Sequence, residues 1–396
     1  MIRFATVAVT ATTIALLLGA TMLVGGAYAQ ATPGSCRTPS TRVAFADESL
    51  AAAVRAQLPG SVRAITCGDL AGVRTLQANG AGITSLVGIE AAVNLRRLDL
   101  RDNQIADLGP VRTLQRLERL DVRDNLVTDL DPLRDLQRLQ RVDLGGNLIA
   151  DLAPLGGLRA LTRLELRATG TVDVAPLAAV TSLRILNLRD NQIVDVAPLA
   201  SLTGLQTLVL ERNRITDVRP LMSLTALEAL NLNDNLLRDG VGIGAFDGLR
   251  TLTLRGNALR DTGFLFALVA LEQLDLRDNE LVSLRGLERL TSLTHLQLAN
   301  NAITDLAPLG SLASIQQLDV SRNLVASLGA LASLHALTEL DVSRNRLSDV
   351  RILLGLDALE VLDLGRNCLG DDPRGHVRQL VSKGVTVANE RQGTCN

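Results

Sequence analysis

The sequence predicts a solenoid of the α/β class, in which one long parallel sheet is combined with short helical turns. Three observations predict it: a 22-residue repeat, a Leu-x-Leu alternation in every unit and a column of Asn. Twelve units run from Leu95 to Ala358 without insertion or deletion, after a degenerate unit at residues 73–94 and before a partial one at 359–369. A fixed period of this length is typical of a solenoid, whose units bury their apolar faces only against one another.

Each unit follows the pattern L-x-x-L-x-L-x-x-N-x-I-x-D-L-x-P-L-x-x-L-x-x, with Leu95 at position 1. The central L-x-L has a period of two and therefore predicts a short strand with its leucines on one face. We expect the apolar residues at positions 1, 4, 6, 11, 14, 17 and 20 to share one interior, and each strand to pair in parallel with the next.

Two polar columns accompany the leucines. Position 9 is Asn from Asn103 to Asn367 except at Thr169. A buried amide needs partners, so we expect an Asn ladder that bonds the backbone of neighbouring turns. Position 13 is mostly Asp and position 16 often Pro, as in Asp107 and Pro110. This spacing predicts the start of a short helical turn capped by the carboxylate, and we interpret the Asp column as structural rather than metal-binding or catalytic.

These residues carry a family resemblance. The stretch LDLRDNQIADLGPVRTL, which begins at Leu98, returns with small changes at Leu120, Leu186 and Leu296. It resembles the leucine-rich repeat, specifically the 22-residue class of bacterial internalin-like proteins, over residues 73–369. The resemblance implies a curved, right-handed horseshoe with a concave parallel sheet and short 3-10 or irregular turns on the convex side. It also implies protein binding as the usual role.

The two ends are expected to form caps. FADESLAAAVRAQL, from Phe45 to Leu58, is similar to the helical N-terminal cap of that family, and residues 30–72 are assigned to a linker and this cap. Residues 370–396 are expected to form an α/β C-terminal cap. Its helix should begin at Asp371-Asp372-Pro373 and end at Gly384, with Val377, Leu380 and Val381 facing the last repeat.

The first 29 residues read as a secretory signal. Arg3 precedes an apolar run from Phe4 to Val24, and Ala27-Tyr28-Ala29 is a small-residue cleavage site. We therefore expect a secreted or periplasmic protein with no membrane span after cleavage. An uncleaved N-terminal anchor is the alternative, because the apolar run is long for a signal peptide.

Four cysteines lie outside the signal, two near each end of the repeat region. An even number in an exported protein favours disulfides. Of the three possible connectivities, Cys36–Cys67 with Cys368–Cys395 is the one that does not bridge the two ends of the array. A metal site is not expected, because neither pair has C-x-x-C spacing and no His lies with them.

Composition and motifs argue against several function classes. The formal net charge of −2 argues against a nucleic-acid binder, which needs a concentrated basic face. The chain has only His295, His335 and His376, and it lacks a G-x-S-x-G motif, a phosphate loop and an H-E-x-x-H motif. The sequence therefore predicts a protein that is not an enzyme and needs no cofactor, and we expect a monomer.

The candidate binding surface is the concave sheet, where positions 3, 5 and 7 alternate with the buried leucines and point outward. An Arg column at position 3 lies beside an acidic column at position 5, and further Arg residues stand at position 7. The candidates are Arg97, Asp99, Arg101, Arg119, Asp121, Arg123, Arg141, Asp143, Arg163, Glu165 and Arg189.

Farther along, Ile185, Val209 and Ala229 replace charged residues, and they are interpreted as a small apolar patch rimmed by Arg189, Glu211 and Arg212. The charged columns could equally be a self-neutralising surface that keeps an exposed sheet soluble. The sequence thus favours a protein-binding module, with a structural envelope component that has no single partner as the alternative. Separately, DGVGIGAFDG, from Asp239 to Gly248, departs from the repeat and is expected to repack the convex side locally.

Overall fold

The computed structural model describes residues 36, 38–60, 64–369 and 375–389. They belong to one compact unit, Cys36–Asn396. The predicted signal segment lies outside the described residues, as does the expected helix start at 371–373. Among the residues that the structure describes, no helix is both long and apolar enough to cross a membrane.

A single parallel sheet carries one short strand per repeat, and its strands follow one another in sequence order. From β1 to β14 neighbouring strands pair with a register of 22 residues, so that Leu98 lies opposite Leu120, and β15 of the cap pairs with β14 at a separation of 25. Within the described residues the strands are β1 (Thr75–Gln77), β2 (Arg97–Asp99), β3 (Arg119–Asp121), β4 (Arg141–Asp143), β5 (Arg163–Glu165), β6 (Ile185–Asn187), β7 (Thr207–Val209), β8 (Ala229–Asn231), β9 (Thr251–Thr253), β10 (Gln273–Asp275), β11 (His295–Gln297), β12 (Gln317–Asp319), β13 (Glu339–Asp341), β14 (Val361–Asp363) and β15 (Thr386–Ala388).

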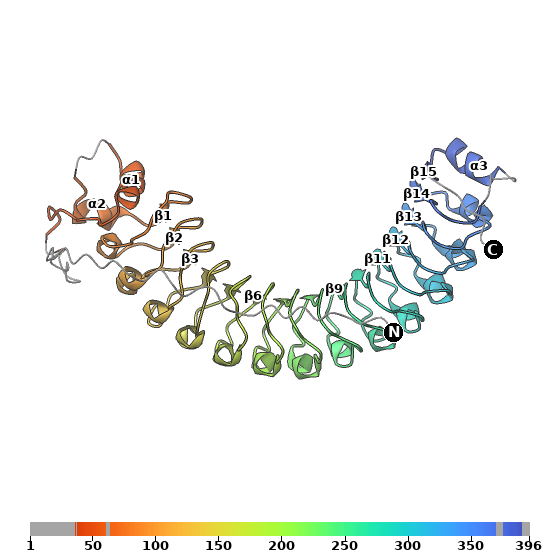
Figure 1. Ribbon diagram of the computed structural model, residues 1–396, viewed down its shortest axis with the longest axis horizontal. Helices are drawn as coiled ribbons and strands as arrows, with labels where there is room; N and C mark the ends of the chain where they lie inside the picture. The colour runs from red at the N-terminus through yellow and green to blue at the C-terminus, as the bar shows by residue number, and fades with distance from the viewer. Residues whose placement is uncertain (1–35, 37, 61–63, 370–374, 390–396) are drawn as a thin grey trace, which may run out of the picture. The chain divides into compact units, whose positions relative to one another are not determined.

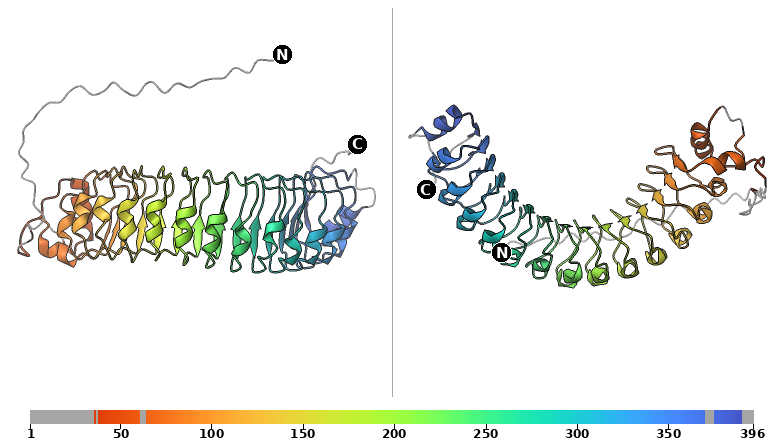
Figure 2. Two further views of the ribbon diagram at one scale, coloured as in Figure 1. Left: turned by 90° about the horizontal axis from the view of Figure 1, so that it is seen from below. Right: turned by 180° about the vertical axis from the view of Figure 1, so that it is seen from behind.

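Short 3-10 turns cross the other side of each repeat. In this unit the strands line the inner side of an arc and the turns line its outer side (Figures 1 and 2). The predicted solenoid with a concave parallel sheet is therefore confirmed. The turns are η1 (Ile89–Ala91), η2 (Gly109–Thr113), η3 (Asp131–Leu133), η4 (Ala153–Gly157), η5 (Ala175–Ala179), η6 (Ala197–Ser201), η7 (Arg219–Ser223), η8 (Ile243–Ala245), η9 (Gly263–Leu265), η10 (Leu287–Arg289), η11 (Ala307–Ser311), η12 (Gly329–Ser333) and η13 (Arg351–Gly355).

The Asn column forms the expected ladder. Asn147, which is fully buried, donates from Nδ2 to the carbonyl oxygens of Val122 and Leu144, and its Oδ1 accepts the N–H of Val127. One amide thus joins its own turn to the preceding repeat. At the exception, Thr169 donates from Oγ1 to Leu166 of its own repeat.

The Asp side chains accept a hydrogen bond at the start of each turn, but they stand one residue before the N-cap position. Asp151 Oδ1 accepts from the N–H of Ala153, two residues on, at 2.8 Å, and Ala153 is the first residue of η4. The same bond recurs from Asp107 to Gly109. The carboxylate therefore satisfies the first free N–H of the turn as an Asx turn, and the residue between them takes the cap position. The predicted structural role of Asp is confirmed, with this change of position.

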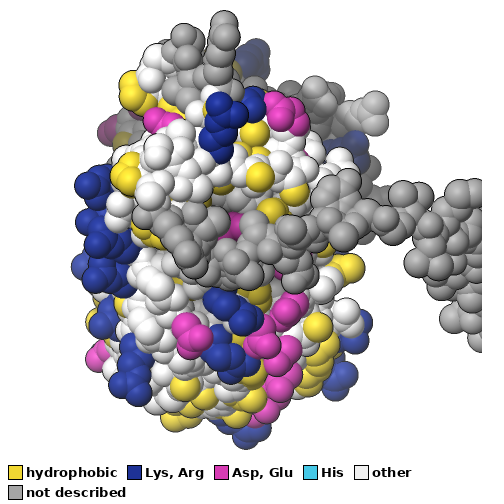
Figure 3. Space-filling model, turned by 90° about the vertical axis from the view of Figure 1, so that its left-hand side faces the viewer, with side chains coloured by type: hydrophobic (Ala, Val, Ile, Leu, Met, Phe, Trp, Pro, Cys, Tyr) yellow, Lys and Arg dark blue, Asp and Glu magenta, His cyan; other side chains and the backbone are white. Residues whose placement is uncertain are grey.

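The N-terminal cap consists of α1 (Glu48–Gln57) and α2 (Cys67–Gly72). One face of α1 is buried, with Leu50, Ala51 and Val54 inside. Cys67 at the start of α2 forms a disulfide with Cys36, as predicted. Figure 3 looks at this end of the molecule and shows hydrophobic side chains scattered among polar ones, as a cap requires.

The C-terminal cap consists of α3 (His376–Ser382) and β15. Leu380 is buried and Val377 packs partly against the core, as expected. The prediction for Val381 is wrong: its side chain is 55 % exposed, because the side of α3 that packs on the repeats carries Val377 and Leu380 instead. Cys368 is disulfide-bonded, and Cys395, its predicted partner, lies outside the described residues.

The glycine-rich repeat repacks the convex side. Phe246 fills the core position and is fully buried. A Cβ on Gly240 would collide with the ring of Phe264 from the next repeat. Glycine at 240 therefore leaves the space into which Phe264 packs.

Candidate functional site

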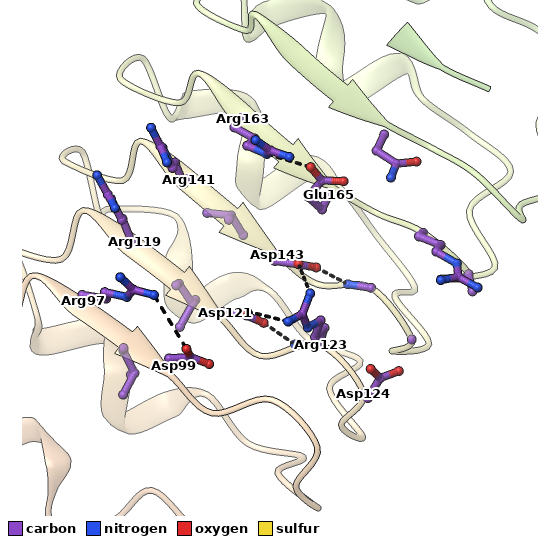
Figure 4. Close-up of a pocket in the computed structure, with 18 residues that line it drawn as sticks. Arg97, Asp99, Arg119, Asp121, Arg123, Asp124, Arg141, Asp143, Arg163 and Glu165 are labelled. Atoms are coloured by element: carbon purple, nitrogen blue, oxygen red, sulfur yellow. Dashed lines mark hydrogen bonds and ion pairs between the residues drawn. The ribbon is translucent and has the colours of Figure 1, made fainter. Parts of the chain in front are cut away.

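The predicted charged columns come together on β2 to β5, where they line a hollow of about 600 Å³ (Figure 4). The strand register places Arg97, Arg119, Arg141 and Arg163 side by side. The acidic residues Asp99, Asp121, Asp143 and Glu165 form the next row along the strands. The repeat period alone dictates this arrangement, because each strand is displaced by one unit.

The acidic row lies deeper than the Arg row. Asp99 is only 6 % exposed, and the carboxylates of Asp121, Asp143 and Glu165 are half-buried. Asp99 Oδ1 has no hydrogen-bond partner among the described residues, and Arg101 Nε lies 4.0 Å from it. Burial raises the pKa of Asp121 above its ordinary value, although the N–H and the guanidinium of Arg123 oppose this.

Several of the arginines are already neutralised. Arg163 Nε lies 2.8 Å from Glu165 Oε1, and Arg97 lies 3.9 Å from Asp99. Arg123 reaches two carboxylates, at 3.7 Å from Asp121 and 3.5 Å from Asp143. Pairs of this kind are partly exposed and contribute little to stability, so they cross-link the surface only weakly.

Arg119 and Arg141 differ from their neighbours. Their guanidinium groups are exposed and have no ion pair or hydrogen bond within the part of the chain that the structure describes, and Figure 4 draws no contact from either. They stand side by side on β3 and β4. These two cations are therefore available to an anionic group that enters the hollow.

Asp143 is the most perturbed acid of the hollow. Burial raises its pKa to about 6, and repulsion from Asp121 and Glu165 adds to this effect. Its own repeat supplies no arginine to oppose this effect, because position 7 is Gly145 here, whereas the repeat of Asp121 has Arg123 at that position. Asp143 therefore depends on Arg123 of the preceding repeat for its ion pair.

The two glycines that follow β4 also open the hollow. Gly145 and Gly146 stand where the preceding repeat has Arg123 and Asp124, and all four residues line the hollow. Gly146 has a φ of 70°, the left-handed conformation that position 8 adopts throughout the array. This pair was not among the predicted site residues, although the loss of two charged side chains in one repeat is visible in the sequence.

The second group of candidates does not form a continuous patch. In the strand register, Thr207 lies beside Ile185, and Asn187 and Asn231 flank Val209. The apolar side chains are therefore separated by polar ones. This region carries no apolar anchor comparable to those of protein interfaces.

The residues expected to rim that patch form a closed ion network instead. Asp190 accepts hydrogen bonds from Arg167, Arg189 and Arg212 at 3.1–3.3 Å. Arg189 also lies 3.1 Å from Glu211. The arginines lower the pKa of Asp190 against the opposing effect of burial. Asp190 was not among the sequence candidates; Arg189 precedes it directly, and the register brings Arg167 and Arg212 to it from the two neighbouring repeats.

Nothing in the described part of the chain gathers three or more potential metal ligands of the His, Cys, Asp or Glu type. The hollow is a charged recess. Within the described residues it holds two guanidinium groups without a partner, those of Arg119 and Arg141, and one acid, Asp143, whose pKa is raised to about 6.

Comparison with known proteins supports the repeat assignment. A family model described as leucine-rich repeats (2 copies) matches residues 93–135, 181–221 and 291–333. A search of curated proteins gives no match. The chain is similar to the crystal structure of an internalin, InlF, from Listeria monocytogenes, with 29 % identity, a TM-score of 0.71, and coverage of 89 % of this chain and 96 % of that one.

A leucine-rich repeat protein of Leptospira interrogans is similar as well, with 27 % identity, a TM-score of 0.77, and coverage of 83 % of this chain and 86 % of that one. The leucine-rich repeat fold is a protein–protein interaction module, and its members are typically scaffolds without enzymatic activity. The period, the sheet and these similarities together identify the chain as a leucine-rich repeat protein of the 22-residue, internalin-like class.

Proposed function

We propose that the protein is a binding module that acts outside the cytoplasm and receives an acidic segment of a protein partner in the hollow on β2 to β5. The observation that carries this proposal is the pair of exposed guanidinium groups of Arg119 and Arg141 at the hollow, which have no partner among the described residues. Arginine is favoured at protein interfaces and binds carboxylates through two parallel hydrogen bonds.

The surrounding acids add a dependence on pH. Above pH 6 Asp143 is ionised and repels an incoming carboxylate, whereas below pH 6 it is neutral. Binding of an acidic segment should therefore strengthen as the pH falls from 7.5 to 5.5. The disulfide Cys36–Cys67 is in keeping with an oxidising compartment.

The proposal is tested by crosslinking capture from envelope and culture fractions, with a bait that begins at residue 30. The test variant carries Arg119→Glu and Arg141→Glu. The matched control carries Arg112→Glu and Arg159→Glu, which make the same charge change at exposed residues outside the strands. A protein captured by the wild type and the control, and lost with the test variant, supports the proposal.

The captured protein then allows a direct measurement. We expect the test variant to bind it roughly tenfold more weakly or worse, a loss of about 1.4 kcal/mol or more. Equal affinity for all three baits would refute the role of the hollow. Retention of the same cell-wall material by all three baits, without dependence on salt, would favour a structural envelope component.

A further inference from the structure

The break in the Asn ladder at Thr169 changes the backbone contacts around it. In the other repeats of the ladder, Asn Oδ1 accepts the N–H of position 11 in the preceding repeat, as Asn147 does from Val127. Thr169 has no amide oxygen, and the N–H of Ile149 donates to its backbone carbonyl instead, at 3.1 Å. The contact between these two repeats therefore differs from the one that recurs along the ladder.

A second row of hydrogen bonds is interrupted at the same place. From Gln104 to Cys368, the N–H of position 10 donates to the C=O of position 11 in the preceding repeat. Among the described residues of this row, only Leu148 and Gly170 lack that bond. The N–H of Gly170 and the C=O of Ile149 therefore have no hydrogen-bond partner within the described part of the chain. Such main-chain groups need water or a ligand to pair with.

The same two residues line a recess of about 200 Å³, which we call the ladder recess. Its apolar lining comes from Ile149, Leu152, Val172 and Pro176. Ile149 and Leu152 belong to the core, so the recess opens onto buried apolar side chains. An apolar cavity of about 150 Å³ holds a benzene-sized molecule. The ladder recess therefore has room for one leucine or phenylalanine side chain.

The mouth of the ladder recess is apolar on one side and acidic on the other. Leu148 is 73 % exposed and lies next to Gly170, and Val172 is 59 % exposed. Asp151 and Asp173 also line the recess. Their negative charges disfavour an acidic side chain at this place, whereas a neutral apolar side chain meets Leu148 and Val172.

A peptide is the class of ligand that matches these features together. In an extended peptide, the N–H and C=O of one residue point to the same side, so that one residue can pair with both Ile149 and Gly170. When a peptide binds in this way, main-chain hydrogen bonds provide affinity and side-chain pockets provide specificity. A lipid tail has no N–H or C=O to pair with the open groups, and a sugar has no large apolar group to fill the recess.

The ladder recess adjoins the hollow on β2 to β5. Ala168 lines the hollow and Gly170 lines the recess, and two residues of extended chain span at most about 7 Å. We propose that the ladder recess binds an extended segment of the protein partner through its main chain and one leucine-sized side chain. This segment continues the acidic one held in the hollow, and in that respect the inference rests on the proposed function.

The test measures fluorescence anisotropy of labelled dodecapeptides with the full chain. Each peptide begins with two glutamates. Four peptides carry one leucine after two, four, six or eight glycine and serine residues, and a reference peptide has no leucine. These spacers are needed because the acidic and apolar side chains enter separate recesses.

Two variants alter the ladder recess, and a third is the matched control. Thr169→Asn restores the ladder amide and should close the recess without weakening the fold, so a loss of binding cannot be attributed to unfolding. Val172→Asn makes the mouth polar. The control, Val194→Asn, changes the same residue type at position 12 of the next repeat, where the side chain is 55 % exposed and outside the recess.

We expect one spacer length to give roughly tenfold tighter binding to the wild type than the reference peptide, because burial of a leucine side chain supplies that much. Thr169→Asn and Val172→Asn should remove most of this advantage, and Val194→Asn should retain it. The same peptide with N-methylleucine keeps the side chain but has no N–H for Ile149, so it should bind several-fold more weakly.

An advantage below about twofold at every spacer length would overturn the proposal. It would also be overturned by an advantage that survives Thr169→Asn, that falls equally with Val194→Asn, or that is unchanged by N-methylation. The reference peptide tests the hollow separately. If Arg119→Glu with Arg141→Glu leaves its binding unchanged, the proposed function fails, while the leucine advantage still decides whether the ladder recess binds a peptide.

Discussion

Replacing the half-buried Asp143 with Asn should stabilise the protein at neutral pH, contrary to the usual effect of removing one partner of an ion pair. The folded pKa of about 6 stands against an ordinary value of 3.8. At 1.36 kcal/mol per pH unit, this difference corresponds to at most about 3 kcal/mol that ionised Asp143 costs the fold at pH 7. Asn keeps the acceptor for the Gly145 N–H but loses the ion pair with Arg123. Because the side chain also retains 23 % exposure, we expect a net gain of about 1–2 kcal/mol.

The sign of the pH dependence follows from the raised pKa. Between about pH 4 and pH 6 the folded protein binds a proton at Asp143 that the unfolded chain does not bind, so the wild type gains stability from this group as the pH falls. Asn at this position does not titrate. The advantage of the variant should therefore be full above pH 7 and should disappear by about pH 4.

Urea denaturation of both proteins from pH 4 to pH 8 measures this difference. Asp124→Asn is the matched control, because it removes the same charge from an exposed residue of the same hollow. An advantage of Asp143→Asn that stays constant with pH, or a loss of stability at every pH, would refute the assignment of a buried and poorly compensated carboxylate.

Three further predictions concern the scaffold. Asn147→Ala removes an amide that bonds two repeats, and each backbone group left unpaired costs about 1–3 kcal/mol, so the denaturation midpoint should fall clearly; an unchanged midpoint would contradict the ladder. Phe246→Ala should cost about 3–5 kcal/mol by thermal or urea unfolding, whereas Phe266→Ala, whose side chain is 52 % exposed, should cost far less. Cys36→Ser with Cys67→Ser should cost about 3–4 kcal/mol, estimated from a sequence separation of 31; hydrogen exchange should accelerate first in α1 and α2, and exchange that is unchanged there would argue against a role of this bond in holding the cap.

The repeat made most of the fold predictable from sequence. One period fixes the strand, the turn and the buried face of every unit, and Asn147 illustrates how one column also fixes the polar contacts between units. The prediction of the fold that proved wrong concerns the C-terminal cap, which follows the last repeat. Val381 follows a helical pattern over one or two turns only, and such a short pattern does not determine which side of α3 packs on the repeats.

The charged surface was only partly predictable. The columns of like residues follow directly from the period, but the choice of partner for each arginine depends on side-chain reach across the register. Arg119 has no ion pair among the described residues although Asp121 lies two residues away, because the carboxylate of Asp121 pairs with Arg123 instead. The opening created by Gly145 and Gly146 is visible in the sequence, yet its effect on Asp143 depends on burial, which the sequence does not give.

The uninterrupted 22-residue register has a consequence for how this chain can change over generations. Recombination between the coding segments of two repeats would delete or duplicate one whole coil, and every flanking strand would still meet a neighbour in register. The Asn that reaches back to the preceding turn would find an equivalent carbonyl after such an exchange. The length of the inner surface can therefore vary in steps of one strand, about 4.8 Å, without redesign of the interior.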